Sequence, residues 1–163
     1  NPVFVYGADR FMKNCREAGV DTLIVPDLPY EEKGELLPFC LKHGICLISM
    51  IAPTSRHRIH MIAKEAEGFV YCVSSMGVTG VRKDISEDAR EMIKIVKEVK
   101  EIPCAVGFGI STPEQATRIA EFSDGVIVGS AIVKIVEQYG YECVPRVAEY
   151  VRMMKNALRA VGK

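Results

Sequence analysis

Two segments of the sequence contain glycine and serine in a pattern that exposes backbone N–H groups as hydrogen-bond donors to a phosphate ester. The first is Gly107-Phe108-Gly109-Ile110-Ser111 and the second is Gly129-Ser130, and each follows a short apolar run. Glycine lets an anion approach backbone N–H groups closely, and the N-terminus of a following helix favours negative charge. Either segment alone occurs in many α/β proteins for turn geometry. Together, after two successive strands, they predict a phosphate site at Gly109, Gly129 and Ser130.

A longer glycine-bearing segment, residues 74–83, follows the apolar run 69–73. Its two glycines, with no helix start before Ser86, predict a loop of about a dozen residues, and loops of that length in compact domains often serve as lids or binding loops. Thr79 offers a hydroxyl and Gly80 a bare amide. The alternative interpretation is an ordinary surface connection.

One acidic residue, Asp27, follows the apolar run 22–25 within the sequence Pro26-Asp27-Leu28-Pro29. The two prolines stiffen the chain and direct the carboxylate toward the end of the strand where ligands bind. Asp27 is therefore a candidate ligand-face acid. The alternative is that its carboxylate orders its own loop by accepting hydrogen bonds from nearby backbone N–H groups.

Short apolar runs alternate with amphipathic helical patterns along the whole chain. The runs are rich in valine and isoleucine, which is typical of parallel strands buried on both faces, and they cover residues 22–25, 45–51, 69–73, 104–106 and 126–128. This alternation predicts a single α/β domain over residues 1–163, with a parallel sheet of five strands and about six helices. It fits an open doubly wound sheet or part of a (β/α) barrel, since a complete barrel takes about 250 residues.

Two helix boundaries leave clear signals. The sequence Thr112-Pro113-Glu114-Gln115 predicts a helix start with threonine as N-cap, proline at the first helical position and glutamine three residues after the cap. Pro38 predicts a helix that begins near Glu35, because proline is tolerated in the first turn and bends a helix later. A last helix is predicted over residues 144–158.

Composition excludes several classes of protein. Among 163 residues, Lys+Arg and Asp+Glu both total 21, so the chain lacks the basic excess of a sequence-independent nucleic-acid binder. No apolar run approaches the roughly 18 residues that a membrane span requires. The six cysteines are dispersed without a Cys-x-x-Cys pair, which is typical of reduced thiols in a cytoplasmic protein and predicts no metal site.

The order and spacing of residues 78–80, 107–113 and 128–133 closely resemble the tryptophan synthase alpha chain family. Residues 25–32, 52–54 and the opening Asn1-Pro2 are similar to the same family, so the resemblance extends over essentially the whole chain. It implies a (β/α)8 TIM barrel, of which this chain covers about the last five βα units as a partial barrel. The implied activity is a lyase reaction of tryptophan biosynthesis, the retro-aldol cleavage of indole-3-glycerol phosphate to indole and glyceraldehyde 3-phosphate.

The resemblance also implies roles for individual residues. The substrate phosphate is expected to be held by Gly80, Gly109, Gly129 and Ser130. The substrate pocket is expected to be lined by Tyr71, Thr79 and Phe108. Leu28, Pro29 and residues 75–82 are expected to lie toward a beta chain, which carries pyridoxal phosphate (PLP) and receives the indole, whereas the alpha chain itself needs no cofactor or metal.

The family's catalytic Glu and Asp belong to the first two strand exits, which lie upstream of Asn1. We therefore expect no catalytic residue in this chain, and no cleavage by the chain alone. Its open sheet edges predict self-association. Two alternatives remain at this point: a sugar-phosphate isomerase or epimerase on the same barrel with Asp27 as base, and a non-catalytic phosphate-binding half-barrel.

Overall fold

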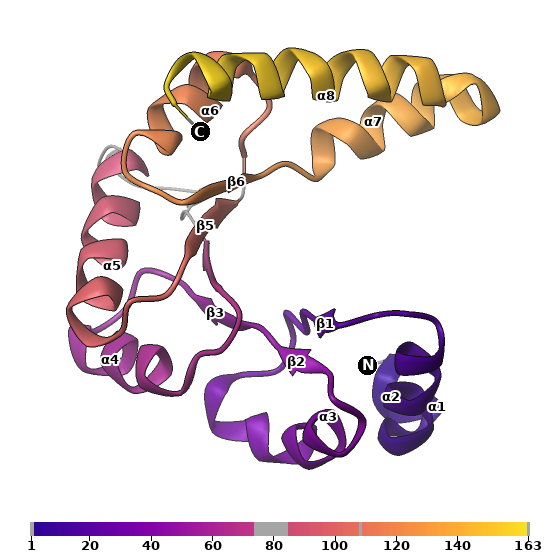
Figure 1. Ribbon diagram of the computed structural model, residues 1–163, viewed down its shortest axis with the longest axis vertical. Coiled ribbons are helices and arrows are strands. Elements are labelled where there is room, and N and C mark those ends of the chain that lie inside the picture. Colours follow the sequence, from indigo (N-terminus) through magenta and orange to yellow (C-terminus); the bar gives the residue numbers. More distant parts are fainter. Residues whose placement is uncertain (1, 74–84, 108, 163) are drawn as a thin grey trace.

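The computed structural model describes residues 2–73, 85–107 and 109–162. The strands follow one another along an arc, and the helices lie on its outer side (Figure 1). All strand pairs are parallel, in a two-stranded sheet followed by a four-stranded sheet. The first sheet contains β1 (Thr22–Leu23) and β2 (Cys46–Leu47), and the second contains, in spatial order, β3 (Ser49–Ile51), β4 (Val70–Val73), β5 (Cys104–Gly107) and β6 (Gly125–Ile127).

Helices alternate with the strands as the sequence predicts. Their bounds are α1 (Pro2–Tyr6), α2 (Ala8–Glu17), the 3-10 helix η1 (Tyr30–Glu35), α3 (Leu37–His43), α4 (Arg56–Glu65), α5 (Ile85–Val99), α6 (Pro113–Ala120), α7 (Ser130–Tyr139), the 3-10 helix η2 (Gly140–Glu142) and α8 (Cys143–Ala160). Thr112 caps α6 in a capping box with Gln115, which confirms the predicted start of this helix. Helix α3 begins at Leu37 with Pro38 in its first turn, close to the predicted position.

The predicted strand over residues 45–51 forms two strands. The Ile48 amide donates a hydrogen bond to the Leu23 carbonyl at 2.9 Å, which continues the pairing of β2 with β1. From Ser49 onward the chain pairs with β4 instead. The apolar pattern does not reveal this change of partner, because Ile48 is itself buried and apolar.

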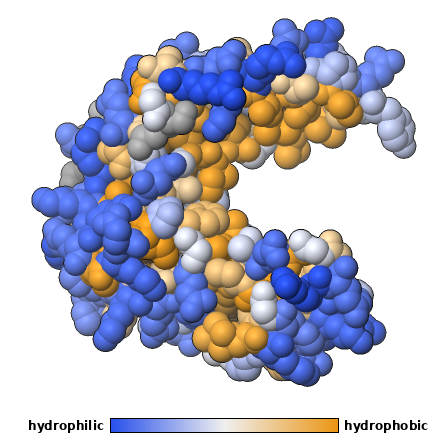
Figure 2. Space-filling model, viewed as in Figure 1, coloured by the Kyte–Doolittle hydropathy of each residue, from blue (hydrophilic) through white to orange (hydrophobic). Residues whose placement is uncertain are grey.

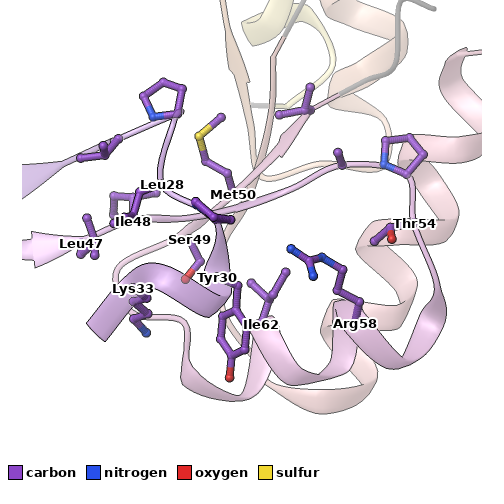
Figure 3. A pocket seen from close by; sticks show the side chains of 16 residues that line it. Leu28, Tyr30, Lys33, Leu47, Ile48, Ser49, Met50, Thr54, Arg58 and Ile62 are labelled. Carbon is purple, nitrogen blue, oxygen red and sulfur yellow. The ribbon is translucent and has the colours of Figure 1, made fainter. Parts of the chain in front are cut away.

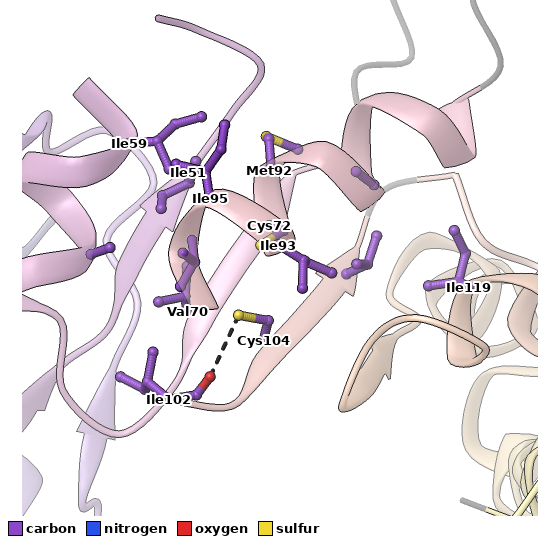
Figure 4. Packing of buried hydrophobic residues seen from close by; sticks show 14 of the residues in the cluster. Ile51, Ile59, Val70, Cys72, Met92, Ile93, Ile95, Ile102, Cys104 and Ile119 are labelled. Carbon is purple, nitrogen blue, oxygen red and sulfur yellow. Dashed lines mark hydrogen bonds between the residues drawn. The ribbon is translucent and has the colours of Figure 1, made fainter. Parts of the chain in front are cut away.

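The strands of the four-stranded sheet are fully buried on one face only, which corrects the prediction of burial on both. On one face the side chains pack against the helices and are completely buried; they are those of Val70, Cys72, Cys104 and Val106. Residues of α5 pack against this face (Figure 4). The alternate residues, including Tyr71 and Ala105, are half-buried. They face the hollowed inner side of the arc, where apolar side chains gather (Figure 2).

Two separate hydrophobic cores support the arc. The larger core lies between the four-stranded sheet and helices α4, α5, α6 and α8. The smaller core contains Met12, Leu36, Cys40 and Ile45 as buried members, from α2, the residue before α3, α3 itself and the residue before β2. The carboxyl ends of β4, β5 and β6 therefore rest on the larger core, which supports residues 109–112 and 129–130 after β5 and β6.

Candidate functional site

A cavity of about 340 Å³ lies where β4, β5 and β6 end. We call it the β5–β6 cavity, and it is lined by Tyr71, Gly109, Ile110, Ser111, Ile127, Gly129, Ser130, Ala131 and Lys134. The structure thus brings together Gly109, Gly129 and Ser130, three of the four residues that the sequence assigns to a phosphate site. The fourth, Gly80, lies outside the described residues.

Helix α7 starts at this cavity. Gly129 is its N-cap, and the Gly129 carbonyl accepts hydrogen bonds from the Ile132 and Val133 amides at 2.9 and 3.1 Å. The earlier amides of a first helical turn have no partner inside the helix, and their N–H bonds point outward at its N-terminal end. The amides and the hydroxyl at Ser130 therefore lie where an anion in the cavity can accept hydrogen bonds from them.

The segment after β5 also lines the cavity. Gly109 adopts a φ of 74°, a left-handed conformation that favours glycine. The following residues are fixed from two sides: the Ser111 amide donates to Oε1 of Gln115 at 2.8 Å, and the Tyr150 hydroxyl of α8 donates to the Ser111 carbonyl at 2.8 Å. The loop that presents Gly109 is therefore anchored to both α6 and α8.

Tyr71, which the family resemblance assigns to the substrate pocket, also lines this cavity. Its ring occupies the space above Gly107, where an added Cβ would lie only 2.1 Å from the Tyr71 hydroxyl oxygen. Burial raises the pKa of the Tyr71 hydroxyl above its ordinary value of 10.0. This hydroxyl is therefore neutral at physiological pH and does not repel an anion. The other two predicted pocket residues, Thr79 and Phe108, lie outside the described residues.

Lys134 also lines the β5–β6 cavity, although its place in the sequence suggests only a solvated position one turn into the helix. The residue is exposed, but it lies four residues after Ser130 and so shares the same face of α7. The spacing of the two residues is the sequence signal for this placement.

A second cavity, of about 450 Å³, lies at the ends of β1 and β3. We call it the β1–β3 cavity. Its wall includes Leu28 and Pro29, together with Tyr30, Lys33 and Arg58 (Figure 3). The sequence resemblance expects Leu28 and Pro29 at an interface with a beta chain, and the structure shows that both residues border this cavity.

The cations of the β1–β3 cavity are held by carboxylates. Arg58 forms a bidentate ion pair with Glu31, in which Nη2 lies 3.0 Å from Oε2. Nζ of Lys33 lies 3.5 Å from Glu65, which also accepts a hydrogen bond of 2.9 Å from the Tyr30 hydroxyl. The hydrogen bond from Arg58 lowers the pKa of Glu31 below its ordinary value of 4.5, so this pair is fully ionised at neutral pH.

Asp27 lies beside the β1–β3 cavity and not in its wall. The Leu28 amide donates to the Val25 carbonyl at 3.1 Å, which places Pro26 and Asp27 at the corner of a β-turn. Pro26 and Leu28 line the cavity, whereas Asp27 is exposed. Within the described chain its carboxylate makes no hydrogen bond or ion pair, so no contact supports the interpretation that it orders its own loop, and its role as a ligand-face acid stays a prediction.

The described residues contain no group of three or more His, Cys, Asp or Glu side chains placed to hold a metal ion. No helix in this part of the chain combines the length and the apolar character needed to cross a bilayer.

A family model for the tryptophan synthase alpha chain matches residues 1–159. The curated alpha chain of Thermoanaerobacter pseudethanolicus is 47% identical over 161 residues, which cover 97% of this chain and 61% of the relative. That of Geobacillus kaustophilus is 50% identical over 138 residues, which cover 85% of this chain and 52% of the relative. The chain thus spans about 61% of the length of the first relative.

Solved structures show the same relationship. The tryptophan synthase structure from Mycobacterium tuberculosis matches with a TM-score of 0.83 and 36% identity, over 98% of this chain and 60% of that one. The alpha subunit from Campylobacter jejuni matches with a TM-score of 0.82 and 31% identity, over 93% of this chain and 60% of that one. These matches confirm the prediction of a partial (β/α) barrel.

Proposed function

The chain belongs to the tryptophan synthase alpha chain family, and we propose that it forms the C-terminal βα units of a cytoplasmic lyase that cleaves indole-3-glycerol phosphate. The products of this reaction are indole and glyceraldehyde 3-phosphate. The observation that carries the proposal is the convergence of Gly109, Gly129 and Ser130 on one cavity at the carboxyl ends of β5 and β6. In (β/α) barrels a phosphate site commonly occupies this place.

The wall of the β5–β6 cavity suits a phosphate monoester. The amides at the start of α7 and the Ser130 hydroxyl offer hydrogen-bond donors, and the neutral Tyr71 hydroxyl adds another polar group. No Asp or Glu is present among the described residues that line the cavity, so an anion meets no like charge there. Gly80 and Thr79, which the family resemblance assigns to the same substrate, complete this proposed binding site.

Cleavage requires more than this binding site. The reaction delivers a proton to the indole ring at C3 and removes a proton elsewhere, so it needs two positioned acid/base groups. The described walls of the two cavities contain no carboxylate, and Asp27 lines neither of them. We therefore propose that this part of the protein positions the substrate through its phosphate and that the acid/base groups come from outside the described residues. Binding alone supplies little transition-state stabilisation.

We further propose that a PLP-dependent beta chain docks beside the β1–β3 cavity, because Leu28 and Pro29 lie there. The alpha chain itself needs no cofactor in this scheme. Self-association through the open edges of β1 and β6 would be an alternative use of the same arc.

Binding and cleavage are tested separately. Titration of the protein with glycerol 3-phosphate, followed through the backbone amide NMR signals of Gly109 and Gly129, is expected to shift both signals, whereas glycerol is not. Ser130→Ala is expected to weaken binding about tenfold, because a hydrogen bond to a charged group contributes about 1.5 kcal/mol or more. Ser49→Ala, the same change in the wall of the β1–β3 cavity, is the matched control.

Indole release from indole-3-glycerol phosphate is measured on the same preparation. We expect residues 1–163 to bind the phosphate ester and to release no indole. Release at the rate of a complete enzyme would contradict the assignment of the acid/base groups. Absence of any shift at Gly109 and Gly129 would overturn the phosphate site itself, and turnover of a pentulose phosphate would favour a sugar-phosphate isomerase.

A further inference from the structure

The start of α7 contains no acidic residue, unlike the starts of α5 and α6, the helices that follow β4 and β5. The first turn of α5 contains Glu87 and Asp88, and that of α6 contains Glu114. Such carboxylates balance the positive end of the helix dipole. The first turn of α7 contains no acidic residue, and within the described chain no side chain caps it. This positive helix end therefore lacks the negative charge that the other two helices carry.

Lys134 adds a second positive charge at the same place. Cα–Cβ bonds tilt toward the N-terminus of a helix, so the stem of Lys134 runs back along the face that Ser130 shares. Lys134 accordingly lines the β5–β6 cavity together with Ser130 and Gly129. A cation close to a helix N-terminus is unfavourable unless an anion lies between them.

Several other lysines of the molecule have acidic partners. Lys97 contacts Glu101 and Asp124, and Lys42 contacts Asp9 at 2.8 Å. Lys134 forms no ion pair with any described residue, and it is the one charged side chain among the described residues that line the cavity. Its charge is therefore available to a ligand.

We propose that Lys134 is the cationic phosphate-binding residue of this site and that it favours the dianionic form of a phosphate monoester. The proposal rests on the proposed function, since it concerns the same cavity. The ligand anion takes the place of the missing carboxylate at the start of α7 and separates the helix end from the ammonium group. Lys134 thereby joins the backbone amides around Gly109 and Gly129 in binding one phosphate.

The test compares Lys134→Met, which keeps an unbranched apolar stem, with Lys134→Arg, which keeps the charge. Lys94→Met is the matched control, because Lys94 is exposed on α5 and does not line the cavity. Inorganic phosphate is titrated into each protein at pH 8, where it is a dianion, and binding is followed by calorimetry and by the amide signals of Gly109 and Gly129. The titrations are repeated at 0.5 M salt.

We expect Lys134→Met to bind phosphate about fivefold more weakly at low salt, the upper end for an exposed charge pair. The difference is expected to narrow at 0.5 M salt because of screening, and Lys134→Arg and Lys94→Met are expected to bind like the original protein. Without phosphate, Lys134→Met is expected to melt at no lower temperature, because it removes a cation from a positive helix end. A purely structural role would lower both affinity and melting temperature.

Two different results would overturn the proposal, and they distinguish failure of the Lys134 role from failure of the proposed function. If the original protein binds phosphate at the Gly109 and Gly129 amides and Lys134→Met binds equally well, the site exists and Lys134 does not serve it. If the original protein does not bind phosphate at all, the proposed function fails together with the role of Lys134.

Discussion

The β5–β6 cavity and the β1–β3 cavity both lie at the carboxyl ends of parallel strands, but their charged groups have different partners. In the β1–β3 cavity, Arg58 is held by Glu31 and Lys33 by Glu65. In the β5–β6 cavity, Lys134 has no acidic partner among the described residues. The larger of the two cavities is therefore the one whose cations are already neutralised.

This difference shows why cavity size alone does not identify an anion site. An arginine or lysine that already contacts a carboxylate offers an incoming phosphate little net charge, since the ligand must compete with the existing pair. Backbone amides at a helix start have no such competitor inside the protein. The smaller cavity thus has the chemistry for a phosphate, and the larger one has the apolar and proline-rich wall suited to other contacts.

The largest effect is expected from a substitution at Gly107, because the Tyr71 ring occupies the space that a side chain at this position would need. In Gly107→Ala the new Cβ would lie 2.1 Å from the Tyr71 hydroxyl oxygen and 2.6 Å from Cζ of the same ring. The ring must then move toward the cavity, and overpacking of this kind costs about 1–3 kcal/mol. Chemical denaturation is expected to show this loss, and phosphate binding is expected to disappear.

A second substitution, at Tyr71 in the Gly107→Ala protein, tests whether the steric clash causes this loss of stability and binding. Tyr71→Phe should rescue Gly107→Ala only slightly, because Cζ remains too close. Tyr71→Val removes the ring and should restore much of the stability and the binding. Equal stability of Gly107→Ala and the original protein would show that the Tyr71 ring does not fill the space above Gly107.

A smaller effect is expected at the helix caps beside each cavity. The Thr112 hydroxyl accepts from the Gln115 amide, and the Ser55 hydroxyl accepts from the Arg58 amide, both at 3.3 Å. Thr112→Ala and Ser55→Ala are each expected to lower the free energy of unfolding by about 1 kcal/mol. Only Thr112→Ala should also weaken phosphate binding, because its cap anchors the loop that presents Gly109. Equal phosphate affinity in both variants would mean that this loop does not position the ligand.

The sequence allowed prediction of those parts of the site that depend on local rules. The convergence of Gly109, Gly129 and Ser130 follows from one rule, that the carboxyl ends of parallel strands share an edge. The capping box at Thr112 follows from residue types at fixed spacing. The family resemblance then identified the barrel to which these segments belong, which the comparisons confirm.

The parts that could not be predicted depend on contacts between residues distant in sequence. Glu31 and Arg58 are 27 residues apart, and no local pattern indicates that they pair. Asp27 follows β1 as expected, but no local pattern indicates that it is exposed at the turn between Val25 and Leu28 and lines neither cavity. Likewise, the division of residues 45–51 into two strands depends on which neighbour each half meets.

The smallest effect is expected from releasing a cation in the β1–β3 cavity with Glu31→Gln. The hydrogen bond from Arg58 lowers the pKa of Glu31, so the ion pair stabilises the fold above pH 4.5, and this contribution is lost as the pH falls through the lowered pKa. The melting temperature of the variant should therefore lie slightly below that of the original protein at pH 7, and the two should converge as the pH falls from 4.5 through the lowered pKa. The side chains are partly exposed, so the difference in melting temperature should also shrink in high salt.

In Glu31→Gln, Arg58 is also free to pair with an added anion. The β1–β3 cavity of this variant should therefore bind phosphate, but more weakly than the β5–β6 cavity does. A second site as tight as the first would mean that a free cation is sufficient and that the amides at Gly109 and Gly129 are not what distinguishes the two cavities.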